Sequence, residues 1–180
     1  MAVMGTTWTV VAASQPLQFP DLLRANQNMV FSVALRFLRD RAAAEEIAQD
    51  VFLELHRHLH EMESEAHVTN WLRKVTGRRC IDAARRRKLR MAVTLDDAPE
   101  PAAAPSNADP LRDRRLRQLV AALPERARMV VILRYQEEMM PEEIAEALDL
   151  PVRTVKSQLT RSLAILRTKF SRLSGGERHG

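Results

Sequence analysis

A helix predicted to begin near Pro151 presents polar side chains of the kinds that read duplex DNA. They are Arg153, Thr154, Lys156, Ser157, Thr160 and Arg161. Arginine and lysine can donate paired hydrogen bonds to guanine, and hydroxyl groups or side-chain stems can contact adenine, thymine or phosphate. The opposite face carries Val155, Leu159 and Leu163 at helical spacing, so we expect these three residues to be buried. The pattern indicates a helix that enters the major groove and reads bases from its first turns.

The residues before this helix predict the partner that would position it. Pro141 suits the first turn of a helix because its missing N–H is not needed there, and the two glutamates that follow complement the positive helix end. Ala145 is small enough to let a second helix cross closely. A tight turn at 149–151 then completes a predicted helix-turn-helix. An ordinary antiparallel helix pair with a solvated basic face is the alternative.

Charge is segregated along the chain, which carries a net charge of +5. Between Trp71 and Arg90, nine lysine and arginine residues accompany a single acid, Asp82. The segment 42–66 has the opposite balance, with seven acidic residues and one base, Arg57. A basic balance favours a polyanionic partner. Together with the basic helix after Pro151, the pattern predicts two basic surfaces and one acidic surface.

No set of residues is typical of an active site. A glycine-rich phosphate loop and a Ser/His/Asp or Cys/His pairing are absent from the sequence, so we expect no catalytic residue, no cofactor and no enzyme activity. His56 and His60 lie four residues apart on one predicted helix face and could share a metal ion. A polar helix end that runs into an exposed loop is the alternative, and we expect no metal. Cys80 is expected to pack as a small apolar side chain.

Hydrophobic periodicity predicts an all-α fold. Apolar residues recur at helical spacing over 21–39, along the acidic segment that follows, over 71–84 and over 141–170, and no segment alternates like a half-buried strand. We expect an interruption near Gly77, since glycine costs about 1 kcal/mol relative to alanine inside a helix. Prolines forbid regular structure across 92–110, which we predict to be a flexible linker.

These boundaries predict two small helical domains. The expected order is a flexible leader at 1–19, a first domain at 20–91, the linker at 92–110, a second domain at 111–173 and a flexible tail at 174–180. Because the linker lacks apolar side chains to fix one arrangement, the two domains should tumble semi-independently. No apolar run approaches the roughly 20 residues that span a bilayer, and the leader lacks the basic stretch and cleavage site of a signal peptide. We therefore expect a cytoplasmic protein with no membrane insertion.

Motifs from both predicted domains occur in an order that resembles the extracytoplasmic-function sigma factors, which direct bacterial RNA polymerase to promoters. The first domain contributes Ala44-Glu-Glu-Ile-Ala-Gln-Asp-Val-Phe-Leu-Glu-Leu, Asn70-Trp-Leu-Arg-Lys-Val and the run Arg85-Arg-Arg-Lys. The second contributes Leu123-Pro-Glu-Arg-Ala-Arg and the helix-turn-helix. Each motif is moderately specific, whereas their order and spacing together are strongly so.

The resemblance implies three surfaces. In the family, the acidic helix docks on the clamp helices of the largest catalytic polymerase subunit, and the corresponding residues are Gln49, Asp50, Leu53 and Glu54. The basic helix is similar to the surface that melts promoters and recognises the minus-ten element, where cationic groups track a single strand. Its residues are Asn70, Arg73, Lys74, Arg78, Arg79, Asp82, Arg85, Arg86 and Lys88. The helix-turn-helix would read the minus-thirty-five element, and contact with the flap region of the polymerase is also implied.

The implied function is promoter-specific initiation of a stress or envelope-response regulon, with an anti-sigma factor as a further partner. Some residues depart from the family pattern. Arg78 stands where many relatives have asparagine, Met140 replaces the usual capping serine or threonine, and Asp149 and Arg153 stand where glycine is frequent. These changes should affect specificity and stability more than the class of function. The alternative is a stand-alone helix-turn-helix regulator that binds duplex DNA without acting as a polymerase subunit.

Overall fold

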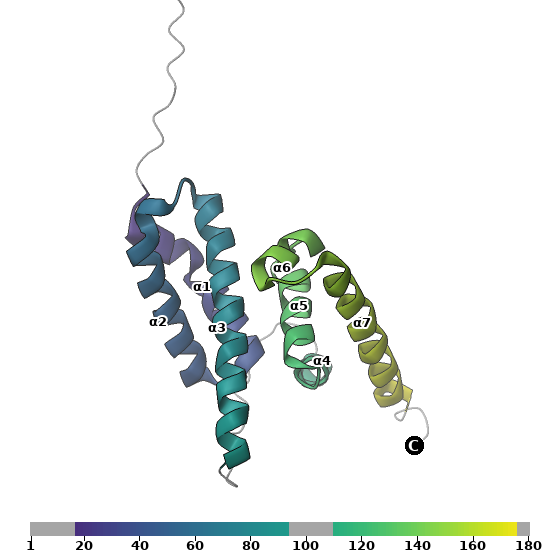
Figure 1. The fold of residues 1–180 in the computed structure, drawn as a ribbon. Coiled ribbons are helices and arrows are strands. Elements are labelled where there is room, and N and C mark those ends of the chain that lie inside the picture. The colour runs from purple at the N-terminus through teal and green to yellow at the C-terminus, as the bar shows by residue number, and fades with distance from the viewer. Residues whose placement is uncertain (1–16, 94–109, 176–180) are drawn as a thin grey trace, which may run out of the picture.

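The computed structural model describes residues 17–93 and 110–175, and these residues form the all-α fold that the sequence predicts. Figure 1 shows two helical units beside each other. The first unit consists of α1 (Phe19–Leu38), α2 (Arg41–His58), the 3-10 helix η1 (Leu59–Glu61) and α3 (Glu65–Val93). The second unit consists of α4 (Pro110–Ala121), α5 (Glu125–Tyr135), α6 (Pro141–Leu148) and α7 (Val152–Gly175).

A sharp reversal joins the first two helices. Arg39 adopts the left-handed conformation, with φ 58°, and its amide donates to the carbonyl oxygen of Leu35, which ends α1. The side chain of Asp40 then accepts a hydrogen bond of 3.1 Å from the amide of Ala43 and caps the start of α2. The helices α1 and α2 pack against each other, and α3 packs against both of them.

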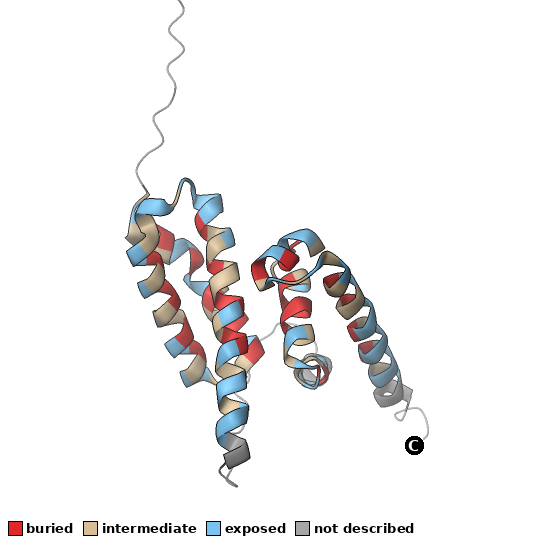
Figure 2. Ribbon diagram, viewed as in Figure 1, coloured by how far each residue is buried: buried red, intermediate tan, exposed pale blue. Residues whose placement is uncertain are grey.

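The core of the first unit forms where these three helices meet. Its fully buried side chains include Val30, Val33, Phe37, Val51, Leu55, Val68 and Leu72. Their spacing within each helix follows the period of 3.6 residues, so one face of each helix is buried and the other remains in solvent. Figure 2 shows this division, with buried residues on the inner faces of the helices.

The second unit contains the predicted helix-turn-helix. Asp149 ends α6 in the left-handed conformation, with φ 53°, and the amide of Leu150 donates to the carbonyl oxygen of Ala145 at 2.9 Å. This is the hydrogen-bond pattern of a helix end that normally uses glycine. At the other end of α6, the carboxylate of Glu143 accepts a hydrogen bond from the amide of Met140 at 2.6 Å, which compensates in part for the missing serine or threonine cap.

The expected interruption near Gly77 is wrong. The helix α3 runs without a break from Glu65 to Val93, and Gly77 is buried inside it. A cost of about 1 kcal/mol is small beside the burial of several apolar side chains, so tertiary packing overrides it. The same helix also extends two residues into the predicted linker, and α4 begins at Pro110.

The two units pack against each other in this structure, and the expectation that they tumble semi-independently in solution stays a prediction. The helix α3 contacts α6 and α5, and α1 contacts α5. The rest of the predicted linker, at 94–109, lies outside the described residues, as do 1–16 of the predicted leader and 176–180 of the tail. Within the described part of the chain, no helix combines the length and apolar composition needed to cross a membrane.

Candidate functional site

An open groove lies between α1 and α2. Its apolar lining includes Phe19, Leu23, Phe31, Ala48, Phe52 and Leu53. Leu53 is one of the large apolar residues that lie at the surface, with 57% of the residue exposed to solvent. Gln49 also lines the groove, so two of the residues that the resemblance assigns to polymerase binding share one concave surface. An exposed apolar side chain beside such a groove is typical of a protein contact.

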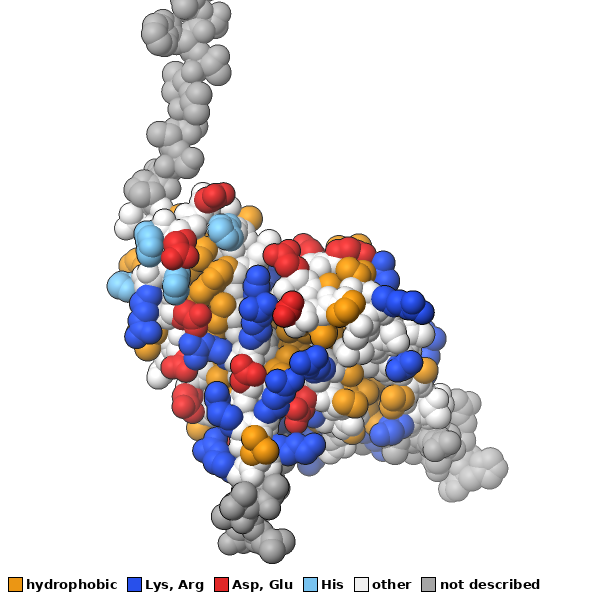
Figure 3. Space-filling view, in the orientation of Figure 1, with side chains coloured by type: hydrophobic (Ala, Val, Ile, Leu, Met, Phe, Trp, Pro, Cys, Tyr) orange, Lys and Arg blue, Asp and Glu red, His pale blue; other side chains and the backbone are white. Residues whose placement is uncertain are grey.

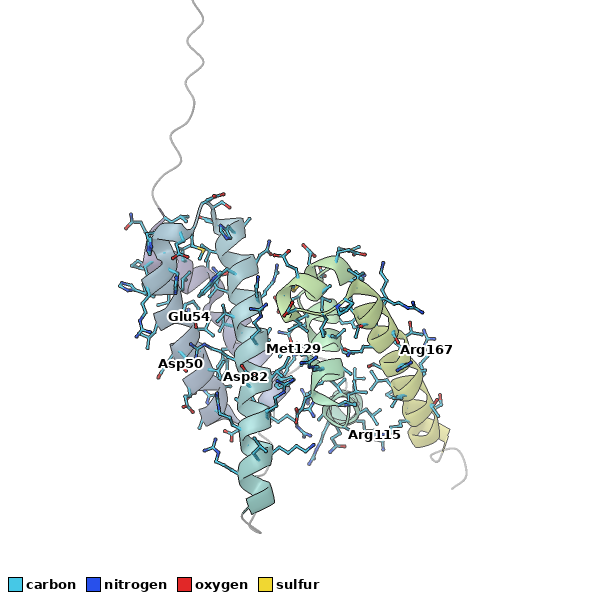
Figure 4. The ribbon with its side chains drawn as sticks, viewed as in Figure 1. Asp50, Glu54, Asp82, Arg115, Met129 and Arg167 are labelled. Carbon is cyan, nitrogen blue, oxygen red and sulfur yellow. The ribbon has the colours of Figure 1, made fainter. Side chains whose placement is uncertain are left out.

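The other two residues assigned to polymerase binding, Asp50 and Glu54, are joined to α3 by Arg79. The Nη1 atom of Arg79 lies 2.9 Å from Oδ2 of Asp50, and its Nε atom donates to Oε2 of Glu54 at 2.9 Å. Figure 4 shows both carboxylates on the same stretch of α2. Arg79 was expected to face DNA, but the structure places it toward α2, where it neutralises part of the acidic surface.

The middle of α3 faces the second unit. Three of its basic residues contact that unit directly: Arg73, Lys74 and Arg78. The Nε atom of Arg73 lies 3.3 Å from Oε2 of Glu137, whose side chain is only 8% exposed. The Nε atom of Arg78 donates to the carbonyl oxygen of Ala147 at 2.9 Å. Asn70, one turn before these residues, accepts a bond of 3.4 Å from Arg73.

The last turns of α3 carry the remaining residues expected to bind the downstream element. Asp82, Arg85, Arg86 and Lys88 are all exposed. Figure 3 shows lysine and arginine side chains gathered toward this end of the helix. Asp82 lies 3.9 Å from Arg85, a separation at which an exposed pair contributes little to stability. The structure therefore divides the residues of the expected single-strand surface: three contact the second unit, Arg79 contacts α2, and the others are exposed.

The helix α7, predicted to be the recognition helix, presents most of the expected residues to solvent. Arg153, Lys156, Thr160 and Arg161 are exposed, and Thr154 and Ser157 are half-buried. Val155 and Leu159 are buried, as expected, but Leu163 is only half-buried. The inward face continues instead through Ser162 and Leu166. A helix of 3.6 residues per turn brings these positions, rather than Leu163, under Val155 and Leu159.

An ion pair links the two helices of the helix-turn-helix. Nζ of Lys156 lies 2.9 Å from Oε1 of Glu142 at the start of α6. The hydrogen bond from Lys156 lowers the pKa of the Glu142 carboxyl below its usual range. Both side chains are exposed, so the pair contributes little stability.

The histidines near the end of α2 contact neighbouring side chains. His58 Nδ1 lies 3.0 Å from Glu61 Oε1, and this contact lowers the pKa of the Glu61 carboxyl. His56 instead packs edge-on against the ring of Phe19, with centroids 5.0 Å apart. Among the residues that the structure describes, no three metal-ligating side chains lie close enough to hold an ion.

Cys80 is buried in the first unit, and burial raises the pKa of its thiol to about 12. Only the thiolate reacts with alkylating agents. At pH 8 we expect iodoacetamide to modify Cys80 at least about a thousandfold more slowly in the native chain than in urea, since an exposed thiol titrates near 8.5. Mass spectrometry of timed samples measures both rates. Rapid native labelling would contradict the buried placement and a purely structural role.

Sequence reasoning did not identify the contacts that Arg128 makes between the two units. Its guanidinium lies over the ring of Phe37, 5.3 Å from the centroid, and donates to the Phe37 carbonyl oxygen at 3.0 Å. It also donates to the carbonyl oxygens of Ala121 and Leu123 at the end of α4. Burial lowers the pKa of this guanidinium. The only signal in the sequence is that Arg128 ends the Leu123-Pro-Glu-Arg-Ala-Arg motif.

Both units match known families. Residues 22–90 match the family described as Sigma-70 region 2, and residues 113–166 match the family described as Sigma-70, region 4. The RNA polymerase sigma-E factor of Streptomyces coelicolor is 31% identical over 156 residues, which cover 86% of this chain and 86% of that protein. The ECF RNA polymerase sigma factor SigW of Bacillus subtilis is 24% identical over 84% of this chain and 88% of its own length.

Two further proteins are similar to this chain, but the matches cover different fractions of their lengths. The probable RNA polymerase sigma factor RfaY of Xanthomonas campestris is 29% identical over 88% of this chain, but the match spans only 42% of that longer protein. Among solved structures, the sigma factor RpoE of Bartonella quintana, crystallised in complex with the anti-sigma factor NepR, superposes with a TM-score of 0.72. That match covers 89% of this chain and 98% of the other at 17% identity, and it establishes the likeness of the fold.

Proposed function

This chain belongs to the RNA polymerase sigma factors, and from that premise we propose that it binds core RNA polymerase and directs initiation at a specific set of promoters. One observation carries the proposal. Three chemically different surfaces lie on separate helices: the apolar and acidic surface of α2, the basic surface of α3 and the exposed polar face of α7. A polymerase subunit that also reads two promoter elements needs all three.

We assign polymerase docking to Gln49 and Leu53 in the groove, with Asp50 and Glu54 at its acidic side. An acidic surface repels the DNA backbone, so it suits a protein partner. The first unit, 20–91, would bind the clamp helices of the largest subunit, and the second, 111–173, would contact the flap region. The basic surface of α3 would hold the melted minus-ten strand.

Upstream reading is assigned to α7. Its exposed donors resemble those of other recognition helices, which fix register through phosphates and specify sequence through base edges. The chain itself would perform no catalysis and would act in the cytoplasm, where its polymerase lies. An anti-sigma factor is a further proposed partner, by analogy with the complex of the Bartonella quintana protein. The regulon would be one of stress or envelope response.

The rival function is a stand-alone regulator, and footprinting separates the two. We expect the chain alone to protect promoter DNA weakly and the complex with core polymerase to protect both an upstream and a downstream element. Strand opening should be detectable with permanganate only when polymerase is present. Strong protection by the chain alone, unchanged by adding core polymerase, would favour the stand-alone regulator instead.

A further inference from the structure

Met140 is open to reagents in solution, unlike the methionines around it. It is 53% exposed, whereas its chain neighbour Met139 is 5% exposed and Met129 is fully buried. The other two methionines whose burial the structure describes, Met29 and Met62, are half-buried. An oxidant must reach the sulfur atom to convert a thioether to a sulfoxide, so among these residues Met140 is the one it meets first.

The sulfur of Met140 lies beside a cation. The Nη1 atom of Arg134 is 3.9 Å from Sδ of Met140, and it also donates to the carbonyl oxygen of Met139 at 3.1 Å. Arg134 lies in the last turn of α5, so its guanidinium ties the end of α5 to the residues just before α6. A thioether sulfur is a weak acceptor, and the contact with Sδ adds little while the sulfur is reduced.

Met140 also caps the start of α6, the first helix of the helix-turn-helix. A serine or threonine at this position would offer an oxygen atom to the amides of the first turn, which lack carbonyl partners within the helix. The carboxylate of Glu143 meets part of this need, because it accepts a hydrogen bond from the amide of Met140. The side chain of Met140 itself supplies no oxygen, although a guanidinium with several N–H donors lies next to it.

Oxidation would supply that oxygen. A hydroperoxide such as hydrogen peroxide transfers one oxygen atom to Sδ: the S–O bond forms, the O–O bond breaks, the sulfur loses two electrons and the peroxide leaves as water. The product is a polar sulfoxide, and because the nearest donor is a guanidinium, the new hydrogen bond is charge-assisted. A thiol-dependent sulfoxide reductase reverses the reaction, since two thiols become a disulfide and the oxygen leaves as water.

We propose that Met140 is a site of reversible oxidation by hydroperoxides, and that its sulfoxide oxygen accepts a hydrogen bond from Arg134 and stabilises the turn that leads into the helix-turn-helix. Methionine oxidation usually disrupts buried packing, as it would at Met129 or Met139. Met140 is exposed, so its oxidation removes little apolar contact. The inference concerns the second unit alone and does not depend on the proposed function.

Peptide mass spectrometry after timed treatment with hydrogen peroxide measures the selectivity. Trypsin releases residues 135–153 as one peptide, because no lysine or arginine lies between Arg134 and Arg153, and fragment ions separate Met139 from Met140. We expect Met140 to be oxidised about tenfold or more faster than Met139 in the native chain, and both at the same rate in urea, where exposure no longer distinguishes them. Equal native rates would overturn the assignment of Met140 as the site.

Thermal unfolding of the full chain, followed by circular dichroism, measures the effect of the new oxygen. Met140→Leu removes the oxidisable sulfur at similar volume, and oxidation of the other methionines affects both chains alike. We expect peroxide to raise the Tm of the wild type by about 2–4 °C relative to Met140→Leu treated in the same way. Treatment with a sulfoxide reductase and dithiothreitol should remove the difference. Untreated Met140→Gln, whose amide oxygen stands in for the sulfoxide, should also exceed untreated Met140→Leu in Tm.

Arg134→Gln tests the partner of the sulfoxide oxygen. Met140 should still be oxidised in this variant, but the rise in Tm should be lost because the guanidinium is gone. Arg126→Gln is the matched control, since Arg126 is an exposed arginine on the same helix, and the rise should persist there. An unchanged or lower Tm in the oxidised wild type, or an equal rise in Arg134→Gln, would overturn the proposed hydrogen bond.

Discussion

Leu53→Asp is expected to weaken binding to core RNA polymerase by about 10- to 150-fold, because burial of a leucine side chain is worth about 1.5–3 kcal/mol. The substitution should leave the fold intact, since Leu53 is 57% exposed and contributes little to the core. It also leaves the contacts of Arg79 with Asp50 and Glu54 in place. Charge reversal at Asp50 or Glu54 would disturb those contacts. A loss of polymerase binding could then result from a change in local structure rather than from the loss of a docking residue.

A titration of labelled core polymerase with each variant measures this effect. Leu89→Asp is the matched control, because Leu89 is 69% exposed on α3 and lies away from the residues that line the groove. We expect the control to bind core polymerase like the wild type. Equal affinities for Leu53→Asp and wild type would show that polymerase docks elsewhere.

Alanine at Lys156 or Arg161 is expected to reduce transcription from a cognate promoter by about 5- to 150-fold, which corresponds to the loss of about 1–3 kcal/mol from a good base contact. Both residues are exposed on α7, and neither lies near the groove on α2. Affinity for core polymerase should therefore stay unchanged. A residue that reads a base should relax preference at one upstream position, whereas a phosphate contact should weaken all sequences alike and flatten the salt dependence.

Lys169→Ala provides the matched control for this second experiment. Lys169 is an exposed lysine on α7, several turns beyond the first turns, which we propose to enter the major groove. Its loss should affect transcription less than that of Lys156. If the Lys156 and Arg161 variants kept wild-type activity and upstream preference, the assignment of upstream DNA reading to α7 would be wrong.

Most of the fold was predictable because the buried residues repeat at helical spacing. Val155 and Leu159 are buried as the pattern predicts, and the expected turn at 149–151 forms. Helix propensity alone could not decide whether the helix is interrupted near Gly77. A local cost of about 1 kcal/mol does not reveal whether another helix will pack over the glycine.

The partners of the site residues were the least predictable part. Arg79 pairs with residues 25 and 29 positions earlier, and Arg73 and Arg78 contact residues 64 and 69 positions later. A charge run shows that a helix is basic, but it does not show which of its faces meets another element. The exposed donors of α7 were predicted more reliably, because the spacing of its apolar residues already fixes the outward face.

Run-off transcription with purified core polymerase tests the central proposal most directly. The template is a promoter library with randomised upstream and downstream elements, transcribed with and without the chain. We expect transcripts only when the chain is present, and the selected templates should share two sequence elements at a fixed separation. Chain-dependent enrichment of a single duplex element, or no transcript from any template, would contradict its role as a sigma factor.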